Sequence, residues 1–184
     1  MLYTSILIHF MKSVSLLLIF LFFLTSCNQS AIPTQIQKET TTTTYIFIRH
    51  AEKDLSDPNN RNPNLTEEGK TRAENWAKIL ADTKVDIIYT TDYIRTRKTA
   101  EPIATSQGLE TTIYNPKALN DSDFQKKTKG KTTVIVGHSN TTPSFVNKII
   151  GENKYKSIDE KIYGKIFILT ITNNAITDIV LNIN

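Results

Sequence analysis

The sequence predicts an α/β fold: a three-layer α/β/α sandwich with a mostly parallel central sheet and an antiparallel edge. From residue 45 onward, short apolar runs that are β-branched or aromatic alternate with segments of helical periodicity. This alternation is typical of parallel sheets that helices cover on both faces. Near the C-terminus two apolar runs follow one another directly, which predicts the antiparallel edge.

The first predicted strand covers residues 45–48, which are apolar throughout, as in a strand buried on both faces. A helix is predicted from residue 65 to about residue 82, with Thr66 as a plausible N-cap. Apolar or small residues recur at helical spacing in this segment and define its buried face. They are Ala73, Trp76, Ala77 and Leu80.

A second strand is predicted at 85–89, followed by a helix that Thr91-Asp92 caps and that ends near Gly108. We expect Pro102 to kink this helix or shorten its last turn, because proline removes one backbone hydrogen bond. Residues 111–114 predict a short edge strand.

Residues 132–136 predict a strong central strand. Thr142-Pro143 fits the N-cap and first position of a helix that continues to Ile150. The last two strands, 165–171 and 175–181, flank a probable hairpin turn.

The N-terminal segment has the pattern of an export signal. Met11-Lys12 is followed by the apolar stretch 14–24 and by a small-residue site that ends at Cys27. The last four residues of that site resemble the lipobox of bacterial lipoproteins, whose cysteine becomes a lipid-modified N-terminus. The alternative is a plain transmembrane anchor or an uncleaved signal, but the apolar run is shorter than the ~20 residues of a spanning helix. Met11-Lys12 alone makes an ordinary start for such a signal.

These features divide the chain into three parts. They are a signal peptide at 1–26, a lipidated Cys27 with a Thr-, Gln- and Ser-rich tether at 27–44, and one domain at 45–184. We therefore expect a lipid-anchored, extracytoplasmic protein of the bacterial cell envelope, facing the periplasm or on the outer membrane. Cys27 is the only cysteine, so cysteine chemistry is otherwise absent.

The charge pattern does not favour a nucleic-acid partner. The chain has 22 basic and 18 acidic residues, and the excess does not form a stripe. A local cluster of lysines occupies positions 126, 127, 129 and 131. A solvated loop and helix end is the favoured interpretation of this cluster, with a lip for acidic ligands as the alternative.

Four residues that suit phosphate chemistry follow the predicted strands. Arg49 and His50 come after the first strand, Arg95 lies beyond the second, and His138 follows the central strand. The carboxyl ends of parallel strands meet at one edge, where open α/β sheets bind ligands. Guanidinium groups match phosphoryl oxygens, and a histidine between two of them is held neutral with a lone pair free for attack. Alone, each histidine would be a core residue and each arginine a surface charge.

The chain resembles the histidine phosphatase superfamily, also called phosphoglycerate mutase-like, branch 1, over about residues 45–181. Four ordered motifs carry the resemblance: R-H-A-E at 49–52, L-T-E-E-G at 65–69, the segment 89–100 around Arg95, and G-H-S at 137–139. Ala51 replaces the signature glycine of the first motif, and we expect this change to be tolerated. A structural envelope protein with no ligand would require the four motifs to be accidental.

The resemblance implies that His50 is the nucleophile and forms a phosphohistidine, while Arg49, Arg95 and His138 hold the phosphoryl oxygens. No metal or cofactor is implied. The family places a carboxylic proton donor where Leu119-Asn120-Asp121 lies here, so Asp121 is the candidate and Asp123 the second choice.

Three residues near these motifs have other interpretations. Asp121 and Asp123 fit a turn or helix cap equally well. Glu52 is a runner-up for the proton donor, but its position beside His50 favours orienting an arginine. Asn140 either contacts the ligand or caps the next helix.

The predicted function is a metal-independent phosphoric monoester hydrolase of the histidine acid phosphatase type. Its substrate would be a phosphorylated small molecule or a phosphoprotein. The protein would contact the membrane through its lipid anchor. The short segments between motifs argue against a phosphoglycerate mutase-like phosphotransferase, which carries longer insertions. A lipoprotein that binds phosphate or another anion without turnover is the alternative from a different class.

Overall fold

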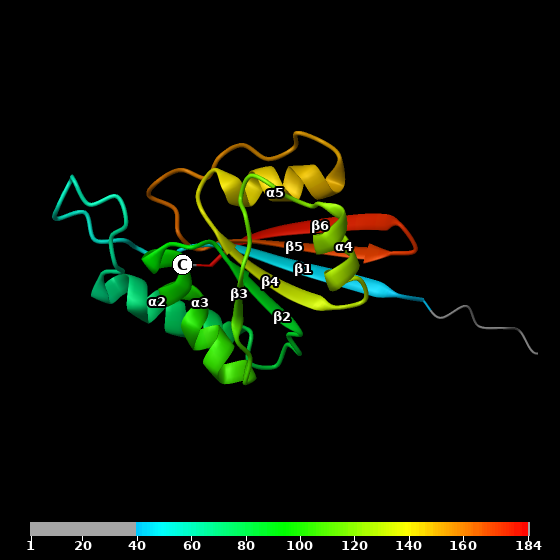
Figure 1. The fold of residues 1–184 in the computed structure, drawn as a ribbon, viewed down its shortest axis with the longest axis horizontal. Helices are drawn as coiled ribbons and strands as arrows, with labels where there is room; N and C mark the ends of the chain where they lie inside the picture. The colour runs from blue at the N-terminus through cyan, green and yellow to red at the C-terminus, as the bar shows by residue number, and fades with distance from the viewer. Residues whose placement is uncertain (1–39, 184) are drawn as a thin grey trace, which may run out of the picture. The chain divides into compact units, whose positions relative to one another are not determined.

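The computed structural model describes residues 40–183, which form a six-stranded mixed sheet with helices on both faces (Figure 1). The strands are β1 (Thr42–Arg49), β2 (Ile87–Thr90), β3 (Thr111–Ile113), β4 (Thr132–Gly137), β5 (Lys165–Thr172) and β6 (Ala175–Asn182). The described helices are α2 (Glu67–Ile79), α3 (Ile94–Gln107), α4 (Ser122–Thr128) and α5 (Thr141–Ile150).

The strand order is β3-β2-β4-β1-β5-β6. The first four strands in this order pair in parallel, and β5 pairs antiparallel with both β1 and β6. The predicted fold class, including the antiparallel edge, is confirmed.

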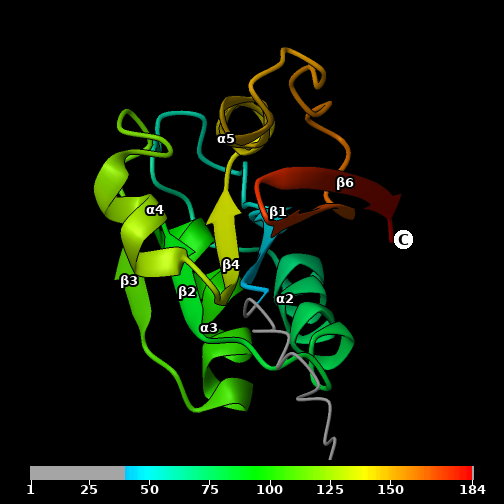
Figure 2. The ribbon, with the colours of Figure 1, turned by 90° about the vertical axis from the view of Figure 1, so that its right-hand side faces the viewer.

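Alternating side chains of β1 supply the two hydrophobic cores. Ile46 and Ile48 pack with residues of α2 and α3 on one face of the sheet. Tyr45 and Phe47 pack with α4 and α5 on the other face (Figure 2). Burial of both faces stabilises the central strands and fixes where each strand ends.

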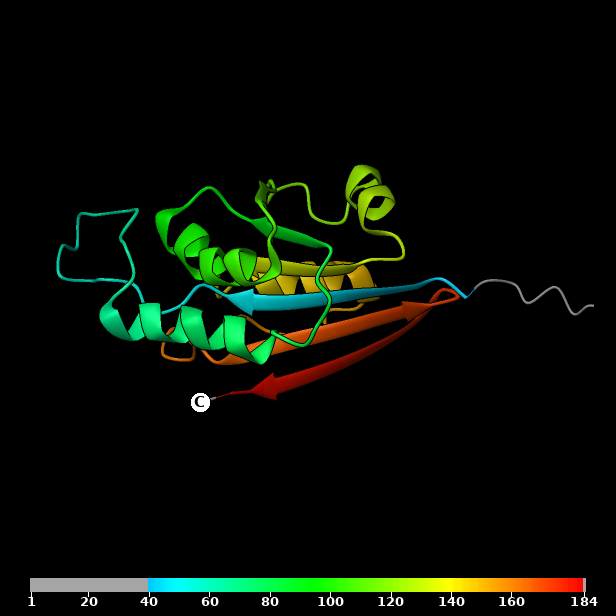
Figure 3. The same cartoon turned by 90° about the horizontal axis from the view of Figure 1, so that it is seen from below.

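The hairpin between β5 and β6 forms as predicted, and Figure 3 shows the two strands side by side at one edge of the sheet. Asn173 and Asn174 occupy its turn with φ angles of 50° and 69°. Two consecutive left-handed residues make the turn that matches strand twist, and asparagine tolerates this conformation better than most residues.

Helix α3 ends before Gly108, as predicted, but differs from its prediction at its start and at Pro102. It begins at Ile94, with Tyr93 rather than Thr91-Asp92 at the N-cap. Pro102 does not shorten the helix, which continues to Gln107. The residues directly after the proline, Ile103 and Ala104, are buried in the core, and their packing outweighs the loss of one hydrogen bond.

Helix α4 carries part of the lysine cluster on its exposed side, where Lys127 forms an ion pair with Asp123 at 2.8 Å. This arrangement is that of a solvated helix end. Within residues 40–183, no helix has the length and apolar character needed to cross a bilayer. The predicted signal peptide, Cys27 and most of the tether lie outside the described residues.

Candidate active site

Strands β1 and β4 are neighbours in parallel register, which brings the two histidine motifs together. Arg49 stands opposite Gly137, and the backbone N–H of His50 donates to the carbonyl of Gly137 at 2.9 Å. The imidazole rings of His50 and His138 are consequently 5.5 Å apart between centroids. Their position at the C-terminal ends of parallel strands agrees with the usual location of ligand sites in open α/β sheets.

A pocket of about 300 Å³ opens at this edge. Of the residues predicted from sequence, His50, Arg95, His138 and Asn140 line it. Asn140 is at the N-cap position of α5 but makes no side-chain capping bond, so its amide is not committed to the helix. The pocket therefore gathers residues from three separate motifs of the chain.

His50 is presented as a neutral imidazole. Its Nδ1 lies 2.8 Å from the carbonyl oxygen of Ala51, which requires a proton on Nδ1 and leaves the lone pair on Nε2. Burial, assisted by the charges of Arg49 and Arg95 and opposed by the hydrogen bond to Ala51, lowers the pKa of His50 to about 3. The sequence predicted this direction from the guanidinium charges, whereas burial is the larger cause.

His138 is also held neutral. Its Nε2 lies 2.9 Å from the hydroxyl of Thr91, and its Nδ1 faces Nη2 of Arg95 at 3.5 Å. A guanidinium only donates, so Nδ1 is the acceptor and Nε2 carries the proton. Burial, followed by the charge of Arg95, lowers the pKa of His138 to about 4.

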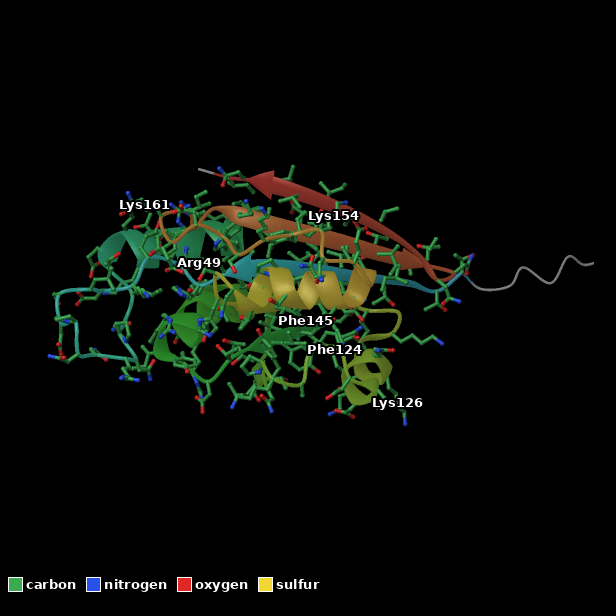
Figure 4. The ribbon with its side chains drawn as sticks, turned by 90° about the horizontal axis from the view of Figure 1, so that it is seen from above. Arg49, Phe124, Lys126, Phe145, Lys154 and Lys161 are labelled. Carbon is green, nitrogen blue, oxygen red and sulfur yellow. The ribbon has the colours of Figure 1, made fainter. Side chains whose placement is uncertain are left out.

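Arg49 is fully buried and is held on one side by the connection between α5 and β5. Its Nη1 donates to three carbonyl oxygens, those of residues 159, 160 and 162, at 3.0 to 3.1 Å. Its Nη2 donates to the carboxylate of Glu160 at 2.6 Å, and the guanidinium lies 4.2 Å above the ring of Tyr163. Figure 4 shows Arg49 and Lys161 at the same end of the domain.

Three guanidinium nitrogens remain buried without a hydrogen-bond partner: Nε of Arg49, and Nε and Nη1 of Arg95. Arg95 is oriented by Tyr93, whose ring lies 4.4 Å below the guanidinium. Unpartnered buried donors on a charged group are costly to maintain. Their presence beside two neutral histidines indicates a site shaped for an anion.

The carboxylates predicted from sequence are not in this pocket. Asp121 is the N-cap of α4 and accepts from the backbone N–H of Phe124 at 2.8 Å, which is the capping interpretation of its motif. Asp123 is occupied by its ion pair with the lysine of α4 described above. Glu52 orients an arginine, as expected, but that arginine is Arg72 of α2, 2.7 Å away. Each of these acids is engaged in a helix cap or an ion pair, and none of them lines the pocket.

Sequence reasoning missed three contributors to the site. Glu160 lines the pocket from a connection without regular structure and without a recognised motif. Thr91 fixes the proton position on His138, although its sequence context suggested a helix cap. Lys53 also lines the pocket, directly after the R-H-A-E motif, and this adjacency was the available signal.

Ala51 shows why the first motif accepts alanine. The residue is fully buried, its N–H donates to the hydroxyl of Thr99 at 2.9 Å, and its φ is not positive. A β-carbon therefore meets no backbone restriction at this position.

Among residues 40–183, no three His, Cys, Asp or Glu side chains are placed to hold a metal ion.

The fold and the pocket define an α/β protein in which a neutral histidine lies beside two arginines at the C-terminal ends of the parallel strands. Comparison with known proteins gives the same class. The model of the histidine phosphatase superfamily (branch 1) matches residues 45–133. This match confirms the resemblance to the histidine phosphatase superfamily that the motifs of the chain indicated. No curated protein matches the chain.

Solved structures with the same fold have low sequence identity. One, assigned as the phosphohistidine phosphatase SixA from Agrobacterium tumefaciens, is 20% identical, with 70% of this chain and 92% of that chain covered and a TM-score of 0.53. A phosphoserine phosphatase variant from Entamoeba histolytica, in complex with phosphoserine, is 16% identical, with coverage of 74% and 94% and a TM-score of 0.58. A protein from Escherichia coli, assigned as an α-ribazole-5′-P phosphatase, is 14% identical, with coverage of 77% and 97% and a TM-score of 0.59.

Proposed function

We propose that this protein is a phosphoric monoester hydrolase that acts through a phosphohistidine on His50 and requires no metal. The observation that carries the proposal is the combination of a free Nε2 on neutral His50 with the unpartnered buried nitrogens of Arg49 and Arg95. A phosphoryl group supplies the acceptors that these nitrogens lack. We expect a phosphoryl group bound to these nitrogens to lie within reach of Nε2 of His50.

In the first step, Nε2 of His50 attacks phosphorus and the bond to the ester oxygen breaks. Arg49 and Arg95 stabilise the charge on the equatorial oxygens, and a donor aimed at developing charge lowers the barrier more than it strengthens ground-state binding. The hydrogen bond from Nδ1 of His50 to the carbonyl of Ala51 keeps the ring oriented and stabilises the positive charge that the ring acquires.

In the second step, water attacks the phosphohistidine and releases inorganic phosphate. The nitrogen–phosphorus bond breaks, and His50 recovers its lone pair on Nε2. His138 contacts the phosphoryl group from the C-terminal end of the neighbouring strand β4. Its neutral tautomer, fixed by Thr91, leaves Nδ1 able to take up a proton when the dianion is bound.

The substrate class follows from the pocket and from the superfamily. Neighbours in fold are named for phosphohistidine and phosphoserine substrates, and we propose a phosphorylated small molecule or phosphoprotein here.

We also propose that Cys27 carries a lipid and holds the enzyme at the outer face of a bacterial membrane. Cys27→Ser should abolish incorporation of labelled palmitate and release the protein into the soluble fraction; palmitate labelling of this variant would contradict the anchor.

Hydrolysis of p-nitrophenyl phosphate in the presence of EDTA tests the function. The wild-type protein should turn over, and His50→Ala should lose activity by at least about 10³-fold, because the nucleophile is absent. A folded His50→Ala protein that retains activity would exclude the phosphohistidine route. If neither protein is active but vanadate still raises the unfolding temperature of the wild type, the pocket binds anions without turnover.

A further inference from the structure

The pocket contains one carboxylate that none of the sequence motifs includes. Glu160 is the only acidic residue among those that line it. Its Oε2 accepts from Nη2 of Arg49 at 2.6 Å, and its Oε1 accepts from the hydroxyl of Ser139. These two partners belong to the R-H-A-E and G-H-S motifs, so this carboxylate joins the ends of β1 and β4.

Glu160 lies on the side of the pocket that faces solvent. Its side chain is 65% exposed, whereas that of Arg49 is completely buried. A phosphoryl group that accepts from the buried nitrogens of Arg49 and Arg95 directs its ester oxygen toward the solvent side. The alcohol must leave in that direction, and Glu160 is the acid that stands there.

We propose that Glu160 is the proton donor to the leaving oxygen. This inference rests on the proposed phosphatase function and names the acid that the function requires. The other candidate acids do not line the pocket: Asp121 caps α4, Asp123 pairs with Lys127, and Glu52 pairs with Arg72.

The protonation state of Glu160 depends on the substrate. The hydrogen bond from Ser139 and the charges of Arg49 and Lys53 lower the pKa of Glu160, although partial burial opposes them. A bound phosphate dianion adds negative charge beside the carboxylate, and like charge raises the pKa of a carboxyl group. The proton enters from water or with the monoanion of the ester.

The proton and the electron pairs balance over both steps. The lone pair of His50 Nε2 forms the bond to phosphorus, the ester oxygen leaves with the electrons of its bond, and the Glu160 carboxyl proton neutralises it to an alcohol. Water then attacks the phosphohistidine, its proton passes to the Glu160 carboxylate, and the nitrogen–phosphorus electrons return to His50. The enzyme is regenerated with Glu160 protonated, ready to release its proton with the product.

Comparison of two leaving groups tests this role in the full chain. Glu160→Gln should reduce kcat/KM for glycerol 2-phosphate by about 10²-fold or more, because an alkoxide needs a proton. For p-nitrophenyl phosphate the reduction should stay below about 10-fold, since nitrophenolate leaves without protonation. Glu152→Gln removes the same charge at the end of α5, outside this pocket, and should change neither value.

Equal losses on the two esters, or no loss on either, would overturn the role of Glu160 while wild-type hydrolysis keeps the phosphatase function intact. If the glutamine variant does not fold, Glu160→Ala and Glu160→Asp are compared on the same esters. Only the aspartate variant should retain part of the activity on glycerol 2-phosphate, and equal values for the two would also overturn it. If the wild type hydrolyses neither ester, the proposed function fails and this inference fails with it.

Discussion

The arginines of the pocket show how single residues define its chemistry. Nη1 of Arg49 donates hydrogen bonds to three backbone carbonyls, yet Nε of the same guanidinium is buried and has no hydrogen-bond partner. Arg95 leaves two nitrogens in the same state. A fold that buries charge normally satisfies every donor, because each unsatisfied one costs about 1–3 kcal/mol. The exception at this edge is explained if the missing acceptors belong to a ligand.

Arg95→Gln should therefore weaken binding of vanadate, a phosphate-like anion. Loss of charge-assisted hydrogen bonds is worth about 1.5–3 kcal/mol, which corresponds to about 10- to 150-fold in Kd. The shift in unfolding temperature with vanadate concentration measures this affinity. Arg97→Gln is the matched control, since Arg97 lies on the same helix but pairs with Asp92 at the exposed surface. If both variants bound vanadate equally weakly, the total positive charge of the protein, and not the position of Arg95, would attract the anion.

The motif residues of the site could be predicted from sequence, because each follows a strand whose apolar character is local information. His50, Arg95 and His138 line the pocket for this reason. Glu160 could not be found in this way. Its connection reaches the site through contacts between residues that are distant in sequence, among them hydrogen bonds with Arg49 that span 110 to 113 residues along the chain.

At the scale of elements, the glycine of the L-T-E-E-G motif has a steric explanation. Gly69 lies in the first turn of α2, against the backbone of Glu52, and a β-carbon at this position would come within 2.2 Å of the Glu52 carbonyl oxygen. The N–H of Thr66 donates to the same oxygen at 3.0 Å. The start of α2 therefore packs on the chain two residues after His50, and the glycine makes this approach possible.

Gly69→Ala should destabilise the protein even though alanine is the better helix former. Overpacking against backbone that cannot move aside costs about 1–3 kcal/mol, and the shift of Glu52 should also lower turnover by displacing His50. Urea unfolding measures the first effect and p-nitrophenyl phosphate hydrolysis the second. Lys70→Ala, on the exposed side of the same turn, should leave both unchanged. An alanine variant as stable as the wild type would contradict this contact.

The elements with strong apolar patterns were predicted with nearly correct boundaries, and the exceptions have physical reasons. Helix α4 was missed because it has seven residues and buries only Phe124 and Thr128, too few for a period to be visible. The start of α3 was misplaced because the hydroxyl of Thr91 forms a hydrogen bond with His138 instead of capping the helix. Tertiary demands at the site overrode local preference in that case.

At the scale of the whole domain, the pocket and the N-terminal end of β1 lie at opposite ends of the sheet. Strand β1 runs from Thr42, beside the turn at Gly130 and Lys131, to Arg49 at the pocket. Figure 4 shows Lys126 and Arg49 at these two ends.

The two neutral histidines also make the stability of the domain depend on pH. The pKa of His50 is lowered from 6.5 to about 3 and that of His138 to about 4, mainly by burial. The unfolded chain therefore binds protons at a higher pH than the folded chain does. The resulting stabilisation is complete above about pH 6.5 and declines as pH falls toward about 4.

The free energy of unfolding should accordingly fall below pH 6.5 by about 1.4 kcal/mol per pH unit for His50, with a smaller decrease from the less buried His138. Urea unfolding at several pH values between about 8 and 5 measures this slope. The double variant His50→Asn, His138→Asn should show a shallower slope, which separates the histidines from carboxylates that titrate at lower pH. Bound vanadate should also reduce the slope in the wild type, because the anion raises both pKa values toward those of the unfolded chain. Equal slopes in the wild type and the double variant would mean that the histidines are charged in the folded protein, and the neutral nucleophile would then have to be abandoned.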